Sequence, residues 1–281
     1  MPPPISVVEA YDQYFASRLY DKRYPQANSS TLAVVLDQIG RLGTKVLDIG
    51  CGNGRYAEAL LKQSTATIVA CDISREAIDE LSSRYAGYVT SGRLRPVHGD
   101  LSVVAGSIDP DEKFDLAIML FGVLGHIYSR TLRHETLASI RALLRPGGRI
   151  VVTVPNAARR FSRQQVAAKS LFTAGHLEAG DVLYERTSDG IVVKMYYHLY
   201  AIDEFVQELE QQGFRIVHVG AESFLPESAV VRSKLLRKLD GVLKTLLPLR
   251  YAYGFVAVAE VASEADASPR VPRPSAPGEV K

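Results

Sequence analysis

The sequence predicts an α/β protein built on a doubly wound, largely parallel sheet. From residue 45 to residue 154, short apolar runs alternate with segments of helical periodicity, as parallel strands joined by crossover helices require. The first apolar run, residues 45–49, leads through three alternating glycines into helix-like spacing. The chain has 281 residues, 47% hydrophobic and 23% charged, which suits one globular domain with insertions.

Spacing also predicts the elements ahead of this first strand. Apolar residues at positions 32, 35, 36 and 39 give residues 31–41 the periodicity of a helix, which Gly43 ends. Residues 5–24 carry four tyrosines interleaved with charged side chains. One interpretation is an amphipathic helix that packs on the sheet, within a helical cap over residues 1–30.

The glycine-rich turn predicts a ligand site. Because Gly50, Gly52 and Gly54 lack a Cβ, they can adopt positive φ and let a ligand approach the main chain. A dinucleotide fingerprint would need its third glycine at Arg55, so the spacing differs from that motif. Asp48, ahead of the glycines, would repel a pyrophosphate but pair well with an ammonium group.

This stretch, Asp48-x-Gly50-x-Gly52-x-Gly54, resembles motif I of the class I S-adenosylmethionine-dependent methyltransferases. Further landmarks of that family follow in order. The apolar run over residues 67–72 ends in Asp72, which the resemblance implies holds the two ribose hydroxyls of S-adenosylmethionine. Ser74 is then the expected N-cap of a helix over residues 75–85.

The later landmarks concern the adenine and the substrate side. His98-Gly99-Asp100-Leu101, after the run at residues 94–97, resembles the adenine-binding loop. Residues 114–121 resemble the fourth strand, and residues 143–152 the turn into strand five, which ends near Pro155. The resemblance implies these cofactor-binding residues: Asp48, Gly50, Cys51, Gly52, Gly54, Asp72, Ile73, Asp100, Leu101, Leu120 and Phe121. Asp100 would accept from the adenine amine and Leu101 would pack on the ring.

The resemblance further implies a Rossmann-like seven-stranded sheet of order 3-2-1-4-5-7-6, with strand seven antiparallel. Strand six is expected at residues 214–219 and strand seven at residues 251–261, with a helix over 228–248 between them. The methyltransferase domain would span residues 31–262, and the composition of residues 263–281 predicts a disordered tail.

The segment between strands five and six, residues 156–200, is longer than a crossover helix requires and is expected to form a substrate lid. Two β-rich runs, 181–186 and 191–197, flank an Asp189-Gly190 turn and predict a hairpin, followed by a helix over 202–212. Four basic residues form a cluster on an expected helix: Arg159, Arg160, Arg163 and Lys169. They are either a phosphate contact or a solvated face.

The sequence gives less information on the residues that would bind the methyl acceptor. His126 lies in the loop after strand four and is a candidate general base, because its ordinary pKa lies near physiological pH; packing of the following helix is the alternative. Tyr20, Arg159, Tyr197 and His198 are candidate substrate contacts. The run Tyr196-Tyr197-His198-Leu199-Tyr200 resembles a segment of the tRNA wobble-uridine carboxymethyl methyltransferases. An N-terminal tyrosine-rich helix commonly closes over the cofactor in the family.

The predicted function is therefore transfer of a methyl group from S-adenosylmethionine to an oxygen or nitrogen of a small molecule. The alternatives are a tRNA methyltransferase and a non-catalytic, methyltransferase-like binding subunit. A net charge of +2 gives no global field for nucleic acid. Cys51 and Cys71 are interpreted as small buried residues, and no metal is expected. A cytoplasmic monomer or homodimer is expected, because no transmembrane run or signal peptide is present; the basic helix at 228–248 leaves peripheral membrane contact open.

Overall fold

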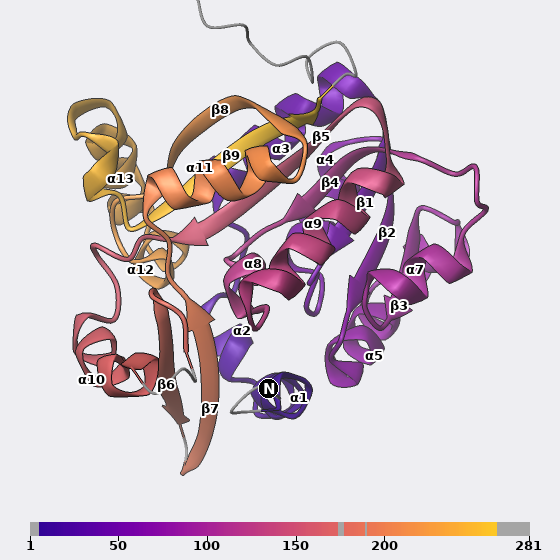
Figure 1. Cartoon of the computed structure of the whole chain (residues 1–281). Helices are drawn as coiled ribbons and strands as arrows, with labels where there is room; N and C mark the ends of the chain where they lie inside the picture. Colours follow the sequence, from indigo (N-terminus) through magenta and orange to yellow (C-terminus); the bar gives the residue numbers. More distant parts are fainter. Residues whose placement is uncertain (1–5, 174–176, 189, 263–281) are drawn as a thin grey trace, which may run out of the picture.

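The computed structural model describes residues 6–173, 177–188 and 190–262. Within these residues, seven strands form one sheet of order β3-β2-β1-β4-β5-β9-β8 (Figure 1). The strands are β1 Lys45–Ile49, β2 Thr67–Asp72, β3 Leu94–His98, β4 Phe114–Met119, β5 Leu144–Pro155, β8 Phe214–Ser223 and β9 Gly254–Val261. In this order, neighbouring strands from β3 through β2, β1 and β4 to β5 are parallel, and β9 runs antiparallel to both β5 and β8. The predicted strand order and its one antiparallel strand are confirmed.

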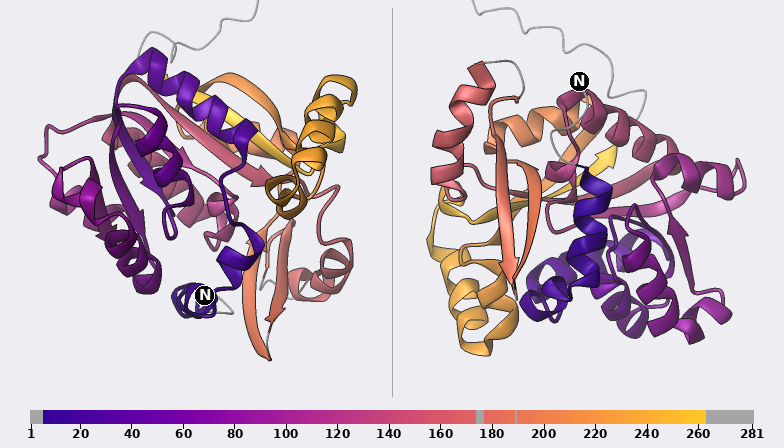
Figure 2. Two further views of the ribbon diagram at one scale, coloured as in Figure 1. Left: turned by 180° about the vertical axis from the view of Figure 1, so that it is seen from behind. Right: turned by 90° about the horizontal axis from the view of Figure 1, so that it is seen from below.

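Helices cover both faces of this sheet (Figures 1 and 2). One buried cluster joins the sheet to α7 Leu101–Ser107, α9 Arg130–Leu143 and α11 Ile202–Gln211, and a second joins it to α3 Ser29–Leu42, α4 Arg55–Gln63 and α5 Arg75–Arg84. Alternation along β5 explains the two clusters, because Ile150 and Val152 enter the first and Val151 enters the second. The sheet is thus a layer between two sets of helices, and the carboxyl ends of its parallel strands meet at one edge.

Local sequence signals set several helix ends. The Ser74 hydroxyl accepts from the Ala77 N–H at 3.2 Å, so Ser74 is the N-cap that the sequence predicts for α5. Gly43 ends α3 with a φ of +139°, and a Cβ there would collide with the carboxylate of Asp115. Asn28 accepts from the Ser30 N–H at 3.1 Å and caps the start of the same helix.

A smaller unit covers the carboxyl edge of the sheet. It contains α1 Val7–Ala16, α2 Leu19–Arg23 and a hairpin of β6 Asp181–Ser188 and β7 Ile191–His198, with α10 Ser162–Thr173 beside the hairpin. Figure 2 shows α1 and α2 against this hairpin. Their aromatic and aliphatic side chains form one buried cluster, which we call the cap. The predicted hairpin is confirmed, although Asp189 of its turn lies outside the described residues.

Three segments differ from the sequence-based expectation. Strand β4 ends at Met119, because Phe121 and Gly122 take positive φ values of 63° and 76° and turn the chain. Arg159 and Arg160 precede α10 instead of lying on it. The helix expected over 228–248 is two helices, α12 Glu227–Arg232 and α13 Lys234–Leu246, because Ser233 is extended and its hydroxyl caps the second one.

The last segment also leaves an apolar stripe in contact with solvent. Leu235, Leu239, Val242 and Leu246 of α13 are exposed, and the helix packs on α12 and β8. A one-turn helix over Leu249–Tyr251 follows, so strand β9 begins at Gly254 and not at the expected residue 251.

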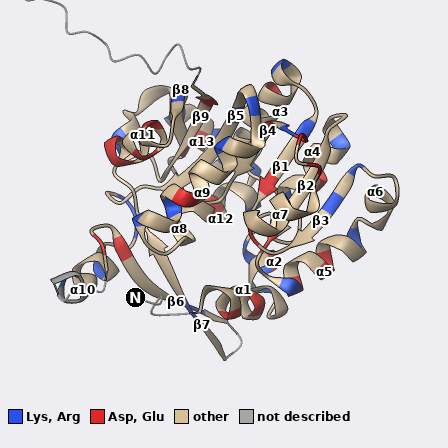
Figure 3. Cartoon of the chain, turned by 45° about the vertical axis from the view of Figure 1, so that its right-hand side comes forward, with Lys and Arg blue, Asp and Glu red and all other residues tan. Residues whose placement is uncertain are grey.

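Among the described residues, no helix is long and apolar enough to cross a bilayer. Acidic and basic positions are interspersed along the ribbon in Figure 3.

Candidate functional site

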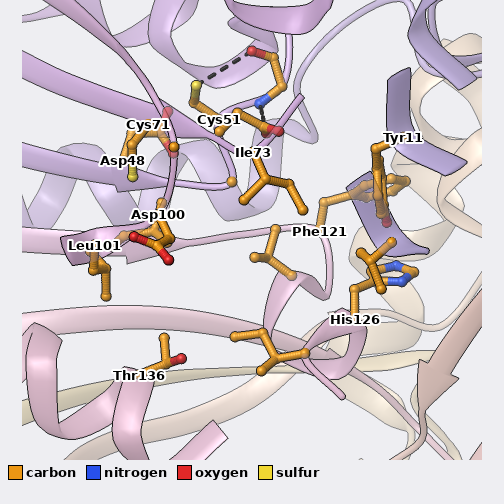
Figure 4. Close-up of a pocket in the computed structure, with 18 of the residues that line it drawn as sticks. Tyr11, Asp48, Cys51, Cys71, Ile73, Asp100, Leu101, Phe121, His126 and Thr136 are labelled. Carbon is orange, nitrogen blue, oxygen red and sulfur yellow. Dashed lines mark hydrogen bonds between the residues drawn. The ribbon is translucent and has the colours of Figure 1, made fainter. Parts of the chain in front are cut away.

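A cavity of about 490 Å³ lies at the carboxyl ends of β1, β2 and β4. Its floor comes from the turns that follow these strands, and its other walls come from α1, α2, α9 and the short helix α8 Val123–His126. Figure 4 shows Asp48 and Asp100 on one side of the cavity and Tyr11 and His126 on the other. Most of the cofactor-binding residues that the sequence predicts meet here: Asp48, Gly50, Cys51, Gly52, Asp72, Ile73, Asp100, Leu101, Leu120 and Phe121.

The glycine turn has the left-handed backbone that its sequence predicts, with φ values of +67° at Gly50, +55° at Gly52 and +89° at Gly54. Gly50 and Gly52 line the cavity, but a Cβ on them would collide with Val123 and Phe15. Gly54 does not line the cavity. It starts α4, and the space of its missing Cβ is taken by Leu81. The turn therefore serves close packing as well as ligand access.

Asp72 fixes the turn to the second strand. Its two carboxylate oxygens accept from the Gly52 N–H at 2.8 Å and the Ser74 N–H at 2.9 Å. Burial raises the pKa of Asp72, and these two backbone donors counteract the shift. Each carboxylate oxygen has a further acceptor position, so the side chain retains capacity for ligand hydroxyls.

Asp48 is buried without sufficient hydrogen-bond partners. One of its oxygens is fully enclosed and has no partner among the described residues. Burial, and then the nearby charge of Asp72, raise the pKa of Asp48 to about 7. A cationic ligand group would supply the missing partner and restore the ionised form, so the site fits the ammonium of a bound amino acid.

Asp100 and Leu101, the two residues expected beside the adenine, differ in their exposure to solvent. Asp100 is exposed and caps α7, accepting from the Ser102 N–H at 2.9 Å and the Val103 N–H at 3.4 Å. The hydroxyl of Ser102, and then these backbone donors, lower the pKa of Asp100, so it stays ionised. Leu101 is buried and presents an apolar surface to the same cavity. This pair offers an acceptor beside an apolar wall.

His126 lines the opposite wall and is held firmly. Its Nδ1 lies 2.8 Å from the carbonyl oxygen of Tyr196, which requires Nδ1 to donate and leaves Nε2 as an acceptor. Its ring stacks on Tyr197 at 4.0 Å and meets the edge of Tyr11 at 5.3 Å. Burial lowers the pKa of His126 to about 3, which makes Nε2 a weak base in the folded chain.

The four candidate substrate contacts separate in the structure. Tyr20 lines the cavity, in contact with Phe121 at 6.0 Å between ring centroids. Tyr197 does not line the cavity, but its ring stacks on the ring of His126. His198 is fully buried elsewhere, with its ring nitrogens 2.7 Å from Asp181 and 3.3 Å from Glu204. Arg159 lines a different, smaller cavity. Among these four residues, the structure brings Tyr20 alone to the main cavity.

Several wall residues were not identified as site residues from the sequence: Val7, Phe15, Val123, Ile127, Leu132, Glu135, Thr136 and Ser139. Tyr11 was noted within the tyrosine-rich segment, and its hydroxyphenyl ring does face the cavity. Asp12 of the same helix accepts from the Ser74 hydroxyl at 2.7 Å, which anchors α1 beside Asp72. The spacing of Tyr11 and Phe15 places both side chains on one face of a helix. It does not predict whether that face packs on the sheet or lines a ligand cavity.

A family model described as "Methyltransferase domain" matches residues 17–219. The chain belongs to this methyltransferase family. Its fold and motifs are those of the class I S-adenosylmethionine-dependent methyltransferases, and S-adenosylmethionine is therefore the cofactor of this methyltransferase. The N-terminal half of the cap lies partly outside the matched range, since α1 ends at Ala16.

Three curated relatives resemble the methyltransferase. A putative methyltransferase of Encephalitozoon cuniculi is 23% identical over 222 residues, covering 75% of this chain and 92% of that protein. A tRNA (carboxymethyluridine(34)-5-O)-methyltransferase of Macaca fascicularis is 29% identical over 52% of this chain and 19% of that protein. The mitochondrial ubiquinone biosynthesis O-methyltransferase of Schizosaccharomyces pombe is 34% identical over 40% of this chain and 38% of that protein. The chain thus matches less than half the length of the last two.

The solved structure of the CcbJ methyltransferase from Streptomyces caelestis has the same fold as this methyltransferase. It superposes with a TM-score of 0.63 at 15% identity, covering 92% of this chain and 100% of that one.

Proposed function

We propose that this methyltransferase transfers a methyl group to an oxygen or nitrogen of a small molecule. The observation that carries the proposal is the cap, which covers the carboxyl edge of the sheet with packed aromatic side chains. Tyr11, Phe15 and Tyr20 of α1 and α2 line the cavity directly. These rings form an enclosed, largely apolar wall beside the cofactor residues, which suits a small acceptor molecule.

The residues proposed to hold the cofactor suit its separate parts. Asp72 would accept from the ribose hydroxyls, Asp48 would pair with the ammonium, and Asp100 with Leu101 would bind the adenine. When bound, S-adenosylmethionine supplies a methyl group that its sulfonium charge makes electrophilic. The protein then has to hold the acceptor in line and exclude water, for which an enclosed aromatic wall is suitable.

His126 is proposed to orient the acceptor and not to remove its proton. Its low pKa makes Nε2 a weak base, but that nitrogen can still accept a hydrogen bond from an O–H or N–H group. The stacking on Tyr197 and the bond to Tyr196 fix the ring, so the direction of this acceptor is defined before a ligand arrives.

The two alternative functions have less support. A tRNA enzyme would need an open basic channel that reaches Arg159 and Arg160; Arg159 is exposed, but Arg160 is half-buried against the rings of Tyr197 and Tyr253. A side-chain-filled space beyond Phe121 would favour a non-catalytic subunit, whereas a cavity of about 150 Å³ lies there. The S. pombe relative, an O-methyltransferase by name, supports an oxygen acceptor.

Transfer of a tritiated methyl group tests this proposal. The protein is incubated with labelled S-adenosylmethionine and, separately, with a low-molecular-mass metabolite extract and with purified bulk tRNA. We expect label in the metabolite fraction and no protein-dependent label in tRNA. Protein-dependent label in tRNA would favour the RNA alternative, and the absence of transfer to either fraction would favour the non-catalytic one.

Replacing His126 by phenylalanine keeps the stacked ring and removes both nitrogens. We expect kcat/KM to fall by roughly 10- to 100-fold, as loss of one orienting hydrogen bond predicts. Because burial lowers the pKa of His126 to about 3, the residue is neutral above that pH in the folded chain. The wild-type rate should therefore show no ionisation near pH 6.5 that the variant lacks.

A matched control replaces His218, an exposed histidine of β8, by phenylalanine. This control should keep the wild-type rate at each pH. If the wild-type profile does contain a step near pH 6.5 that disappears in His126→Phe, His126 acts as a general base and the orienting role is wrong.

A further inference from the structure

A second cavity, of about 150 Å³, lies on the other side of Phe121 from the cofactor cavity. Four arginines line it, Arg23, Arg159, Arg160 and Arg186, and we call it the arginine pocket. It belongs to the same edge of the sheet, because Phe121 follows β4, Arg159 and Arg160 follow β5, and Glu222 ends β8. Phe121 therefore lines both cavities.

These four arginines come from three separate segments, α2, the loop after β5, and β6. None of them forms an ion pair with a carboxylate among the described residues. Arg160 and Arg186 rest instead on aromatic rings, with their guanidinium carbons 4.8 Å from the Tyr253 ring and 4.7 Å from the Tyr184 ring. The Nε of Arg160 is buried and has no hydrogen-bond partner there. Four like charges thus converge in a pocket whose acidic residues are two buried glutamates, Glu222 and Glu227.

The two acidic residues of the pocket do not balance this charge. Glu227 is already paired with the buried guanidinium of Arg55 at 3.2 Å. Glu222 has a buried oxygen without a partner, and burial followed by the nearby charge of Glu227 raises its pKa to about 8. Four arginines therefore face one carboxyl group that is not already paired, which leaves the pocket with an excess of positive charge.

We infer that the arginine pocket binds the oxyanion group, a carboxylate or a phosphate, of the methyl acceptor. The inference rests on the proposed function and narrows its substrate class to anionic small molecules. Guanidinium groups present paired donors in a plane that matches both oxyanions, and a desolvated site strengthens each such bond. The unpartnered Nε of Arg160 is a donor of the kind that an oxyanion needs.

Phe121 sets the relation between the anionic group and the reacting part of the acceptor. Its φ of 63° is unusual for a phenylalanine and places its ring between the cavities. Tyr24 meets that ring edge-on at 4.5 Å, and the Arg55 guanidinium lies over it at 4.4 Å. An acceptor anchored by the arginines would extend past this ring toward the cofactor cavity.

Thermal unfolding in the presence of inorganic phosphate or benzoate tests the inference without any need for turnover. A ligand that binds the folded chain raises the melting temperature in a concentration-dependent way. We expect at least one of the two anions to stabilise the wild type saturably, and the better of the two identifies the oxyanion. Arg160→Gln should weaken the apparent affinity about 10-fold or more, as loss of a charge-assisted hydrogen bond predicts.

Two further proteins complete the experiment. Arg186→Gln removes a second arginine of the pocket and should have the same effect, so a folding defect in one variant does not decide the result. Arg163→Gln changes an exposed arginine of α10 that does not line the pocket and should bind as the wild type does. Stabilisation that is equal in the wild type and in both pocket variants, or absent from the wild type, overturns the inference.

S-adenosylhomocysteine added to the same samples separates the inference from the proposed function. If it stabilises every protein while phosphate and benzoate stabilise none, the cofactor cavity is functional and the arginine pocket is not an oxyanion site. If it stabilises none of them while an anion does, the pocket binds its ligand and the assigned reaction fails.

Discussion

Replacing Asp72 by alanine is expected to weaken the binding of S-adenosylhomocysteine by about 100-fold or more. Two hydrogen bonds from ribose hydroxyls to a carboxylate are each worth about 1.5–3 kcal/mol, and each 1.4 kcal/mol is tenfold in affinity. The substitution also frees the N–H groups of Gly52 and Ser74, which Asp72 holds at 2.8 and 2.9 Å, so the glycine turn loses its anchor. Calorimetric titration measures the change.

A matched variant, Asp79→Ala, removes an exposed carboxylate from α5, the helix that follows Asp72. It should bind S-adenosylhomocysteine as the wild type does, which excludes a general effect of lost negative charge. Circular dichroism of both variants checks that the sheet is retained. Equal affinity in Asp72→Ala and wild type would mean that the carboxylate serves the fold of the turn and not the ligand.

Replacing Arg133 by alanine is expected to lower the free energy of unfolding by about 3–5 kcal/mol, the cost of leaving a buried partner charge unpaired. The Arg133 side chain is fully buried. Its Nε lies 3.1 Å from Glu208 and its Nη2 lies 3.2 Å from Glu178, so it joins α9 and α11 to the segment before the hairpin. Urea unfolding followed by circular dichroism measures the loss.

Arg41→Ala is the control for this substitution. Arg41 forms an exposed ion pair with Asp37 at 2.8 Å within α3, where water and salt screen the charges, so its removal should change the urea midpoint little. If the midpoints of Arg133→Ala and Arg41→Ala coincide, the buried network around Arg133 does not contribute to stability as its geometry suggests.

The sheet and the cofactor side of the site were predictable from the sequence because their signals are local. Asp48 and Asp72 each stand at the end of an apolar run, and the carboxyl ends of neighbouring parallel strands meet at one edge. Ser74, two residues after Asp72, marks the start of the next helix by its capping chemistry. These local signals place the two carboxylates at one edge of the sheet, and the resemblance to the methyltransferase family supplied their expected roles.

Local sequence signals do not predict which of the two neighbouring residues Tyr197 and His198 faces the cap. The two residues are neighbours in β7, so their side chains point to opposite faces of the hairpin. Tyr197 faces the cap and supports His126, whereas His198 bonds with Asp181 and Glu204 on the other side. Which face a strand presents to a ligand depends on tertiary packing, and no pattern within the run specifies it.

The arginine pocket was inaccessible to sequence analysis for a related reason. Arg55 and Glu227 form a buried pair although they are 172 residues apart in the chain. Arg159 and Arg160 were noted as a basic cluster with Arg163 and Lys169, but the chain turns before α10 and separates the first two from the helix. Burial of a charged residue depends on such distant partners, which composition and spacing do not reveal.

Calorimetric titration of the wild-type chain with S-adenosylhomocysteine, repeated in two buffers of different ionisation enthalpy, tests most directly whether the described cavity is the cofactor site. We expect saturable binding at one site per chain. Near neutral pH we also expect proton release, because pairing with the ligand ammonium would lower the pKa of Asp48 from about 7. The absence of binding by the folded protein would contradict the assignment of this cavity to S-adenosylmethionine.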